Sequence, residues 1–564
     1  MTLPTGAAPC PWKSIRTATD ISGNTASQQS FSQARHWLDR CEIGHKICCS
    51  SRRIQLPDRV LDLGAGCNPN DKSHIVLHET GKKTVQAAYA CLSHCWGQGN
   101  HITTTSRTLK THIAGIAWND LPRTFQDAII FTRRLGIRYL WIDSLCIIQD
   151  EPRDLSVQLS KMPEIYENAY NTLAATFSSS NAGGCFSHAR SEFKAREFSV
   201  RDRSGKSHQI FVRRHLPHWL MADPRYTPDL EEDFPLLKRA WVLQERLLSP
   251  RVLHFGRDEL MWECMESAAC ECSFLDHVEP ENVSKIMHHR NLTQGKQSRS
   301  DLGMKWRDLV SLYSRLAMTF EKDKLQAISG LAQQMNRTLK DTYVAGLWKS
   351  SLIADMLWET RHPQTRPSPW RAPSWSWASV KSPVNHVSEL KNIGQKVTAY
   401  AEIERTEVAS AGQDKMGQLT SANLTITAQF CVGSIIVYTK APNMPNASPS
   451  QLMVHERLFN PQERSNAGLQ FAYTRVLLDV TIPPTTTLTL PPEYGSTIDA
   501  RGVYCMRLAK VDNFEYSLLL QCIDHPSGKY ERIGIVGEYK HDDRPDRLPW
   551  GDPDKCFFCT LTLL

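Results

Sequence analysis

The chemically suggestive residues of this sequence share one position, because each stands at or just beyond the carboxyl end of a predicted strand. Together they offer a hydroxyl, an aromatic ring, a turning glycine, a carboxylate and an amide: Ser93, Trp96, Gly97, Asp143 and Gln149. The two strands are predicted over 89–93 and 137–142 from their apolar runs. Ligands of open α/β sheets bind at the carboxyl edge of parallel strands. As a group these residues suit a ligand of nucleotide size, whereas each one alone is explained by capping or core packing.

Cys146 and His94 offer a different chemistry, that of a thiol nucleophile with its base. Both stand at strand ends of the predicted sheet, so they can meet in space, although nothing in the sequence shows that they do. Ser93 and His94 are neighbours in a strand, and strand neighbours point to opposite faces, so these two are not expected to pair.

Two groups of cysteine and histidine have spacings that suit a metal ion. The first group is Cys41, His45 and Cys48, and the second is Cys264, Cys270 and Cys272. Structural zinc takes four ligands in a tetrahedron, and the first group offers only three locally. We therefore expect small buried thiols in both places and no metal.

Residues 60–66, with the sequence VLDLGAG, are similar to the first loop of methyl-transfer enzymes that bind S-adenosylmethionine. In that loop a strand feeds a glycine-rich turn whose backbone approaches the ligand, and a helix follows. Here residues 67–70 extend the turn, and the next strand-like segment, 74–78, comes too soon for the cofactor fold. An ordinary hairpin of 59–63 and 74–78 is the expectation.

The elements that must position these residues follow one another in a regular alternation. Leu121-Pro122 opens a predicted helix, since proline is tolerated in a first turn, and Gly136 ends it in a left-handed cap. A second helix is predicted over 155–169 and a further strand over 173–177. Strand, helix, strand, helix, strand is typical of a parallel α/β sheet with flanking helices.

The sequence pattern divides the whole chain into four predicted parts. Outside the alternating segment, helices are predicted over 31–49, 304–335 and 348–358, a Pro-rich linker over 363–373, and strands from about 397 on, including 424–428 and 432–438. The parts are an N-terminal helix and hairpin extension over 1–88, an α/β domain over 89–246, a helical region ending in a Pro/Trp-rich linker over 247–380, and a β-rich domain over 381–564.

Composition narrows the class of protein. The 564 residues are 41% hydrophobic and 22% charged, which is ordinary for a globular chain that builds a real core. We find no run of ~18 apolar residues and no export signal, and 17 cysteines without such a signal fit free thiols in a reducing compartment. A cytoplasmic location without a membrane span is the expectation. The net charge of +7 is spread over the chain, so nucleic-acid binding is not expected.

Five blocks in order resemble the fungal heterokaryon-incompatibility (HET) domain. They are YACLSHCWG at 89–97, LPRTFQDA at 121–128, LGIRYLWIDSLCIIQD at 135–150, the residues Met162, Ile165-Tyr166 and Asn168-Ala169, and RAWVLQER at 239–246. Most of the remaining chain also looks like the segments that flank this domain in the family.

The resemblance implies a role in fungal non-self recognition that leads to programmed cell death. The family is thought to be similar to Toll/interleukin-1-receptor-type (TIR) domains, which implies a TIR-like or flavodoxin-like sheet, and some of those domains cleave NAD using a glutamate. The acting residues are expected to be Asp143, Ser93 and Cys146, and the ligand-binding residues Trp96, Gly97 and Gln149 with Glu245 and Arg246 of the closing block. NAD is the expected type of substrate, and a protein partner or self-association is expected.

One departure from the family pattern bears on activity. The family commonly has Trp and Glu in the helix before Met162, where this chain has Leu155 and Gln158. A neutral amide neither takes up a proton at pH 7 nor stabilises a developing cation as a carboxylate does, so the departure weighs against NAD cleavage. Two other functions therefore stay open: an enzyme or accessory protein recruited to secondary-metabolite biosynthesis, and a non-catalytic interaction module.

Overall fold

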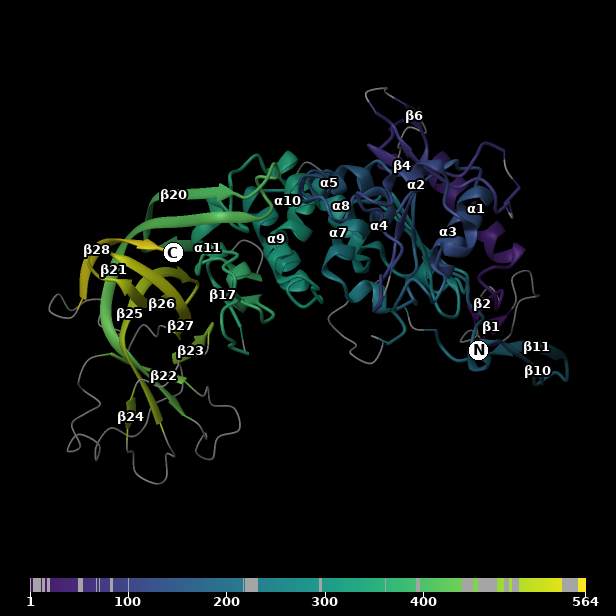
Figure 1. The fold of residues 1–564 in the computed structure, drawn as a ribbon. Helices are drawn as coiled ribbons and strands as arrows, with labels where there is room; N and C mark the ends of the chain where they lie inside the picture. The colour runs from purple at the N-terminus through teal and green to yellow at the C-terminus, as the bar shows by residue number, and fades with distance from the viewer. Residues whose placement is uncertain are drawn as a thin grey trace. The chain divides into compact units, whose positions relative to one another are not determined.

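The chain folds into two compact units, residues 1–295 and 296–564 (Figure 1). The computed structural model describes residues 21–48, 54–66, 68–69, 71–81, 85–99, 101–216, 218, 232–293, 297–360, 362–391, 396–438, 450–454, 474–480, 486–488, 497–539 and 556–564, with the short stretches 2–3, 12 and 16–17. Among the helices in these ranges, none combines the length and the apolar character that a membrane crossing requires.

The first unit is built on an eight-stranded sheet. In spatial order its strands are β14 (Ala268–Cys270), β13 (Leu260–Cys264), β12 (Arg251–Phe255), β9 (Asn171–Ala174), β7 (Tyr89–Ser93), β8 (Tyr139–Trp141), β4 (Arg59–Asp62) and β5 (Val76–Glu79). The four central strands, β12, β9, β7 and β8, are parallel, and the pairs on either side of them are antiparallel. The sheet is therefore mixed, and the expectation of a parallel sheet holds only for its centre.

Helices flank this sheet. They are α1 (Gln28–Gly44), α2 (Leu109–Ala114), α3 (Arg123–Arg134), α4 (Asp143–Cys146), α5 (Pro152–Glu167), α7 (Ala240–Leu248) and α8 (Ser284–Thr293). The predicted helix that opens at Leu121-Pro122 corresponds to α3, and Gly136 beyond its end has the left-handed φ of 75° that favours glycine. Short strands lie outside the main sheet: β1 (Thr2–Leu3), β2 (Arg16–Thr17), β10 (Arg196–Arg201) and β11 (Ser207–Val212) form one small sheet, and β3 (Ile54–Gln55) pairs with β6 (Gln86–Ala87).

The glycine-rich segment after β4 is part of a hairpin. Strands β4 and β5 pair antiparallel, with Leu61 opposite Leu77, and Gly64 and Gly66 take positive φ in the connection. Asp62 at the end of β4 accepts two hydrogen bonds from the Arg138 guanidinium, at 2.6 and 2.7 Å. The hairpin expectation is confirmed, and the described residues between Gly66 and β5 contain no helix of the kind that the cofactor loop would require.

The second unit combines helices with a ten-stranded sheet. Its helices are α9 (Arg299–Tyr313), α10 (Gln326–Leu339) and the single turn α11 (Leu352–Asp355). Its sheet runs β19 (Val397–Ala399), β25 (Thr497–Val511), β26 (Phe514–Asp524), β27 (Lys529–Tyr539), β28 (Cys556–Leu563), β21 (Leu419–Tyr438) and β20 (Glu402–Ser410), with β22 (Ser450–Val454), β23 (Thr474–Leu478) and β24 (Thr486–Leu488) attached. The β-rich C-terminal region is therefore confirmed, whereas the helix predicted over 304–335 is two helices.

Residues 348–358 were expected to be helical, and they are so over 349–355, where a 3-10 turn (Lys349–Ser351) leads into the single turn α11. Two small antiparallel pairs occupy this part of the chain: β15 (Tyr343–Val344) with β16 (Leu347–Trp348), and β17 (Trp358–Glu359) with β18 (Asn385–His386). The buried Asp355 carboxylate accepts hydrogen bonds from the Trp348 backbone N–H at 2.9 Å and from Arg307 at 2.8 Å. These bonds tie the end of the short helical segment to β16 and to Arg307 of α9.

A buried arginine joins the sheet of the second unit to this segment. The Arg532 guanidinium is fully buried, forms an ion pair with Asp479 at 2.6 Å, and lies 3.6 Å from the centre of the Trp358 ring. It also donates to the backbone carbonyls of Met356 and Trp358. One side chain of β27 therefore satisfies polar groups from two other segments, that of Asp479 and that of Met356 and Trp358.

We predict that Arg532→Ala destabilises the second unit by about 3–5 kcal/mol, because it leaves the buried Asp479 carboxylate without its partner. Thermal unfolding of the full chain measures the change, with limited proteolysis at each temperature reporting the unfolding of residues 296–564. The matched control is Arg405→Ala, since the Arg405 side chain is 72% exposed and its ion pair with Glu407 is expected to contribute ~1 kcal/mol at most. Equal stability changes in the two variants would contradict the role assigned to Arg532.

Candidate functional site

The carboxyl end of β7 lies where the chain reverses its direction of travel across the sheet. From β7 the chain crosses to β8 on one side, and from β8 it returns to β9 on the other side of β7. In open α/β sheets such a reversal leaves a crevice at the carboxyl ends of the two strands that separate there. Ser93 is the last residue of β7 and so stands at this point.

Trp96 and Asp143 meet on the rim of the sheet. The Trp96 indole Nε1 donates a hydrogen bond of 2.9 Å to Asp143 Oδ2, and both side chains are partly exposed. Asp143 begins α4, and its second carboxylate oxygen accepts from the Ser144 backbone N–H at 2.7 Å. The ring of His101 lies edge-on to Trp96, 6.0 Å between centroids. The rim therefore offers an aromatic surface beside a partly exposed carboxylate.

Gln149 and Gly97 shape the backbone around this rim. The Gln149 amide Nε2 donates to the backbone carbonyls of Asp143 and Ile147, at 3.2 and 3.1 Å, so it holds the turn that carries Asp143. Gly97 has a φ of 84°, and a Cβ at this position would lie 2.4 Å from the Cβ of Ser180. Only glycine fits there, and the chain can then turn away directly after Trp96.

Beneath the rim, a carboxyl group is enclosed against the end of β7. Ser93 Oγ donates a hydrogen bond of 2.5 Å to Glu245 Oε2, and the Glu245 residue is only 7% exposed. Burial raises the pKa of Glu245 to about 7, and the nearby Asp143 carboxylate acts in the same direction, whereas Ser93 and Arg239 oppose it. Glu245 therefore titrates near neutral pH, at a position where the sheet meets α7.

His94 lies directly after β7 and is a buried, neutral imidazole. Its ring packs edge-on against Phe125 at 4.9 Å, and burial lowers its pKa to about 4 although Asp143 Oδ1 lies 3.9 Å from Nδ1. Its Nε2 atom is buried without a hydrogen-bond partner in the part of the chain that the structure describes. Arg239 donates to the His94 carbonyl at 2.9 Å, which places a guanidinium at the carboxyl edge of β7.

Two of the expected site residues have other surroundings. Cys146 is buried, and burial raises the pKa of its thiol to about 12, so it is protonated at neutral pH and a poor nucleophile. Arg246 pairs with the buried Glu263, with Nη2 2.8 Å from Oε2, and also donates to Ser284. The structure thus brings Ser93, Trp96, Asp143 and Glu245 together and separates Arg246 from them.

Gln158, the departure from the family pattern, is also committed elsewhere. It is buried in α5, and its amide Nε2 donates to Asp58 Oδ2 at 2.8 Å. Two further residues lie at the rim: Arg239, for which no role was predicted, and His94, which was considered only as the base of Cys146. A signal for Arg239 was present, because it opens the same block, 239–246, that carries Glu245.

A surface hollow lies farther along the same unit. It has an empty volume of ≈260 Å³ and lies beyond the end of β12, with Asp233, Phe234, Gly256 and Asp258 in its lining, and the lining does not include Trp96 or Asp143. Two sets of metal-type donor atoms also come together in this unit, each within 4.8 Å: Cys41, His45, Cys48 and Cys264, and separately His218, Glu259, Cys270 and Cys272. The fold regroups the predicted sets: Cys264 joins Cys41, His45 and Cys48 as a fourth donor. His218 and Glu259 join Cys270 and Cys272 in its place.

Comparison with known proteins agrees with the sequence pattern. Residues 89–245 match the family model described as heterokaryon incompatibility protein (HET). No curated protein matches the chain, and no solved structure matches it either. The matched segment begins at the first residue of β7 and ends at Glu245 in α7, so the Ser93–Glu245 hydrogen bond joins its two ends.

The raised pKa of Glu245 predicts a pH dependence of stability. Between about pH 4.5 and 7 the folded chain keeps the Glu245 proton while the unfolded chain loses it. The free energy of unfolding therefore falls with rising pH across this window, by about 3 kcal/mol from this group. Glu245→Gln removes this contribution, so the variant gains stability relative to the wild type from pH 5 to pH 8.

Thermal melts of both proteins across this pH range test the prediction. Glu192→Gln, a substitution of an exposed glutamate in the same unit, is the control and should track the wild type at every pH. Parallel stability curves for Glu245→Gln and the wild type would mean that Glu245 is already ionised at pH 5.

Proposed function

We propose that this chain acts in fungal heterokaryon incompatibility, as a non-self recognition protein whose activation leads to programmed cell death. The rim at the carboxyl end of β7 is its site for a nucleotide-type ligand, and NAD is the substrate. The HET match over residues 89–245 supports the biological role. The order of the central strands, β8-β7-β9-β12, is the 2-1-3-4 order of flavodoxin-like sheets, which supports a TIR-like ligand site at the β7–β9 reversal.

The hydrogen bond between Ser93 and Glu245 carries the chemical part of this proposal. It places a carboxyl group with a pKa of about 7 at the edge where Trp96 and Asp143 meet. A group whose pKa lies near the ambient pH both accepts and returns a proton efficiently. Strongly shifted pKa values gather at functional sites, although buried ion-pair networks also produce them.

Each rim residue has a part that its chemistry supports. The Trp96 indole stacks on a base, Asp143 accepts hydrogen bonds from ribose hydroxyls, and the Arg239 guanidinium faces phosphate. Glu245 takes the proton of the water that attacks the ribose carbon as the bond to nicotinamide breaks. The products are ADP-ribose, nicotinamide and a proton. The family's glutamate position is Gln158 here, so Glu245 is the carboxyl group that takes the role.

Nicotinamide release from NAD by the purified full chain tests this chemistry. Glu245→Gln is expected to lower the rate at least 100-fold, since general acid–base groups contribute ~10²–10⁴-fold. Glu192→Gln is the matched control and should keep the wild-type rate. Wild-type protein that releases no nicotinamide at any concentration, including those at which it self-associates, would rule out NAD cleavage.

Expression in a fungal host tests the biological role. The wild-type chain is expected to arrest growth, and the double variant Trp96→Ala, Asp143→Ala is expected to relieve the arrest because it removes both exposed rim groups. Immunoblots must show equal abundance of the two proteins. Arrest that survives both changes would assign the rim a structural role only.

A second function is favoured by one observation, the buried Gln158 amide bonded to Asp58. If the ancestral carboxylate chemistry is lost, the fold can serve in secondary-metabolite biosynthesis, as an enzyme or an accessory protein. Deletion of the gene would then accumulate a biosynthetic intermediate without any effect on cell fusion. A non-catalytic module that signals through a protein partner or self-association would instead assemble without any turnover of ligand.

A further inference from the structure

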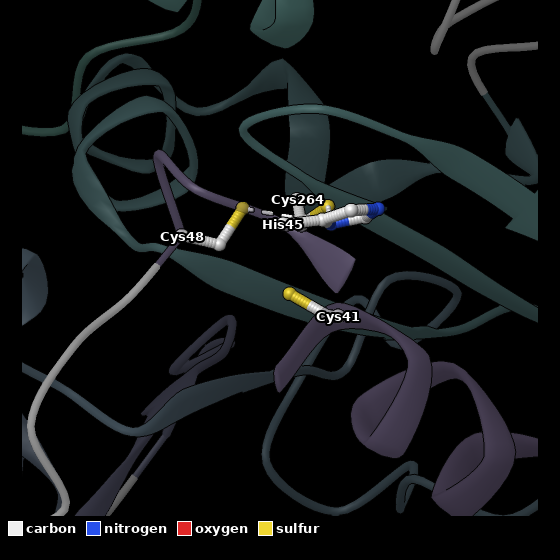
Figure 2. A group of neighbouring side chains, drawn as sticks. All are labelled: Cys41, His45, Cys48 and Cys264. Carbon is white, nitrogen blue, oxygen red and sulfur yellow. Dashed lines mark hydrogen bonds between the residues drawn. The ribbon is translucent and has the colours of Figure 1, made fainter. Parts of the chain in front are cut away.

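Four side chains with metal-binding atoms converge at the end of α1. Cys41 lies in the last turn of the helix, His45 is its C-cap, Cys48 follows shortly after, and Cys264 ends β13. Figure 2 shows the three sulfur atoms and the imidazole directed toward one another from the helix, the loop and the strand. The ligating atoms all lie within 4.8 Å of one another, and the cysteines are 0–1% exposed.

The spacing of these atoms suits a tetrahedral ion. With Zn–S near 2.3 Å and Zn–N near 2.0–2.1 Å, neighbouring nitrogen and sulfur ligands stand about 3.6 Å apart. His45 Nδ1 lies 3.2 Å from Cys264 Sγ and 3.8 Å from Cys48 Sγ, on either side of that value. A disulfide needs an S–S distance near 2 Å, and the structure has all three cysteines as free thiols.

The surrounding groups stabilise negative charge on sulfur. Arg251 is buried and its Nε donates to Cys41 Sγ at 3.3 Å, while its Nη2 donates to the Cys48 carbonyl at 2.8 Å. The Ser267 backbone N–H donates to Cys264 Sγ at 3.2 Å. Three thiolates and a neutral imidazole around Zn²⁺ carry one net negative charge, which the Arg251 guanidinium offsets. Hydrogen bonds of this kind orient the ligands of metal sites.

We propose that Cys41, His45, Cys48 and Cys264 bind one structural zinc ion in a closed Cys3His site. Thiolate and imidazole ligands in a tetrahedron select zinc over hard cations, and four protein ligands leave no position open for substrate. The ion fixes the end of α1 and the loop after it to β13, although His45 and Cys264 are 219 positions apart in the chain. Because such a site does not exist in the unfolded chain, the binding free energy stabilises the fold.

The second donor set is weaker on the same criterion. His218 Nε2 and Glu259 Oε1 are 2.7 Å apart, a direct hydrogen bond, whereas nitrogen and oxygen ligands of one zinc ion stand about 3.3 Å apart. Glu259 also accepts from the Cys272 backbone N–H. These contacts explain the second cluster without an ion, so the proposed site is the first set. Because metal at the second set would add to the total, the test compares the metal content of two variants.

The zinc content of the purified full chain, measured by inductively coupled plasma mass spectrometry, gives that difference. Cys264→Ser is expected to hold one zinc ion fewer per chain than the wild type. Cys185→Ser is the matched control, because Cys185 is an equally buried free thiol of the same unit whose Sγ donates to the Thr124 carbonyl and belongs to neither donor set. It should keep the wild-type zinc content. Co²⁺ substitution should give the charge-transfer absorption of thiolate ligands in the wild type and lose it in Cys264→Ser.

Two further measurements keep the test decisive if Cys264→Ser does not fold. His45→Cys retains four ligands and should keep the zinc, and treatment of the wild-type chain with a chelator should lower its melting temperature, with recovery on addition of Zn²⁺. Equal zinc in the wild type and a folded Cys264→Ser, a disulfide among the three cysteines, or a melting temperature that no chelator changes would each overturn the proposal. Iron in place of zinc would overturn the assignment of the metal.

Discussion

Desolvation of one carboxyl group, that of Glu245, is the constraint on which the carboxyl end of β7 depends. A buried carboxyl group loses the stabilisation that water gives its charge, so it must remain protonated or find a partner. The Ser93 hydroxyl supplies a hydrogen bond at the last position of β7. Since α7 leads directly into β12, this bond fixes the helix that joins the centre of the sheet to its outer strands. The Asp143 carboxylate of the rim lies close enough to Glu245 to raise its pKa further.

A second buried glutamate in the same unit shows how different the outcome can be. Glu263 is fully buried, and burial alone would raise its pKa, but the Arg246 guanidinium and His254 lower the pKa well below its usual range. Glu263 is therefore a permanently charged member of an ion pair, and its role is structural. Glu245 is as enclosed but lacks such a close cation, and its pKa of about 7 leaves it ready to exchange a proton. Adjacent residues of α7 thus have different surroundings: Glu245 accepts a hydrogen bond from Ser93 at the end of β7, whereas Arg246 pairs with Glu263.

Local sequence predicted what local interactions determine. The strand 89–93 and the hairpin after Arg59 were placed closely, because a continuous apolar run specifies the strand and turn residues specify the hairpin. The two predicted strands 424–428 and 432–438 are instead one long strand, β21, since the two halves pair with different partners of the same sheet. No spacing rule predicts that Cys264 meets Cys41, or that Glu245 lies under Ser93, because β-sheet pairing creates both contacts. The rim residues were predictable only as a group at strand ends. The role of Gln158 was not predictable, because its bond to Asp58 joins residues 100 positions apart in the chain.

The cysteine–histidine cluster and the rim of Trp96 and Asp143 lie at opposite ends of the parallel strands. Arg251, which donates to Cys41, also donates to the Tyr170 carbonyl, and the Tyr170 N–H donates to the carbonyl of Tyr89, the first residue of β7. Ser93 closes the same strand four residues later, about 13 Å away at ~3.3 Å per residue. The four donor residues at the amino end are therefore separated from the rim by the length of β7. Loss of the metal would lower stability without changing the titration of Glu245, whereas substitution of Ser93 would change that titration and leave the metal ligands in place, so the two sites are separable by experiment as they are in space.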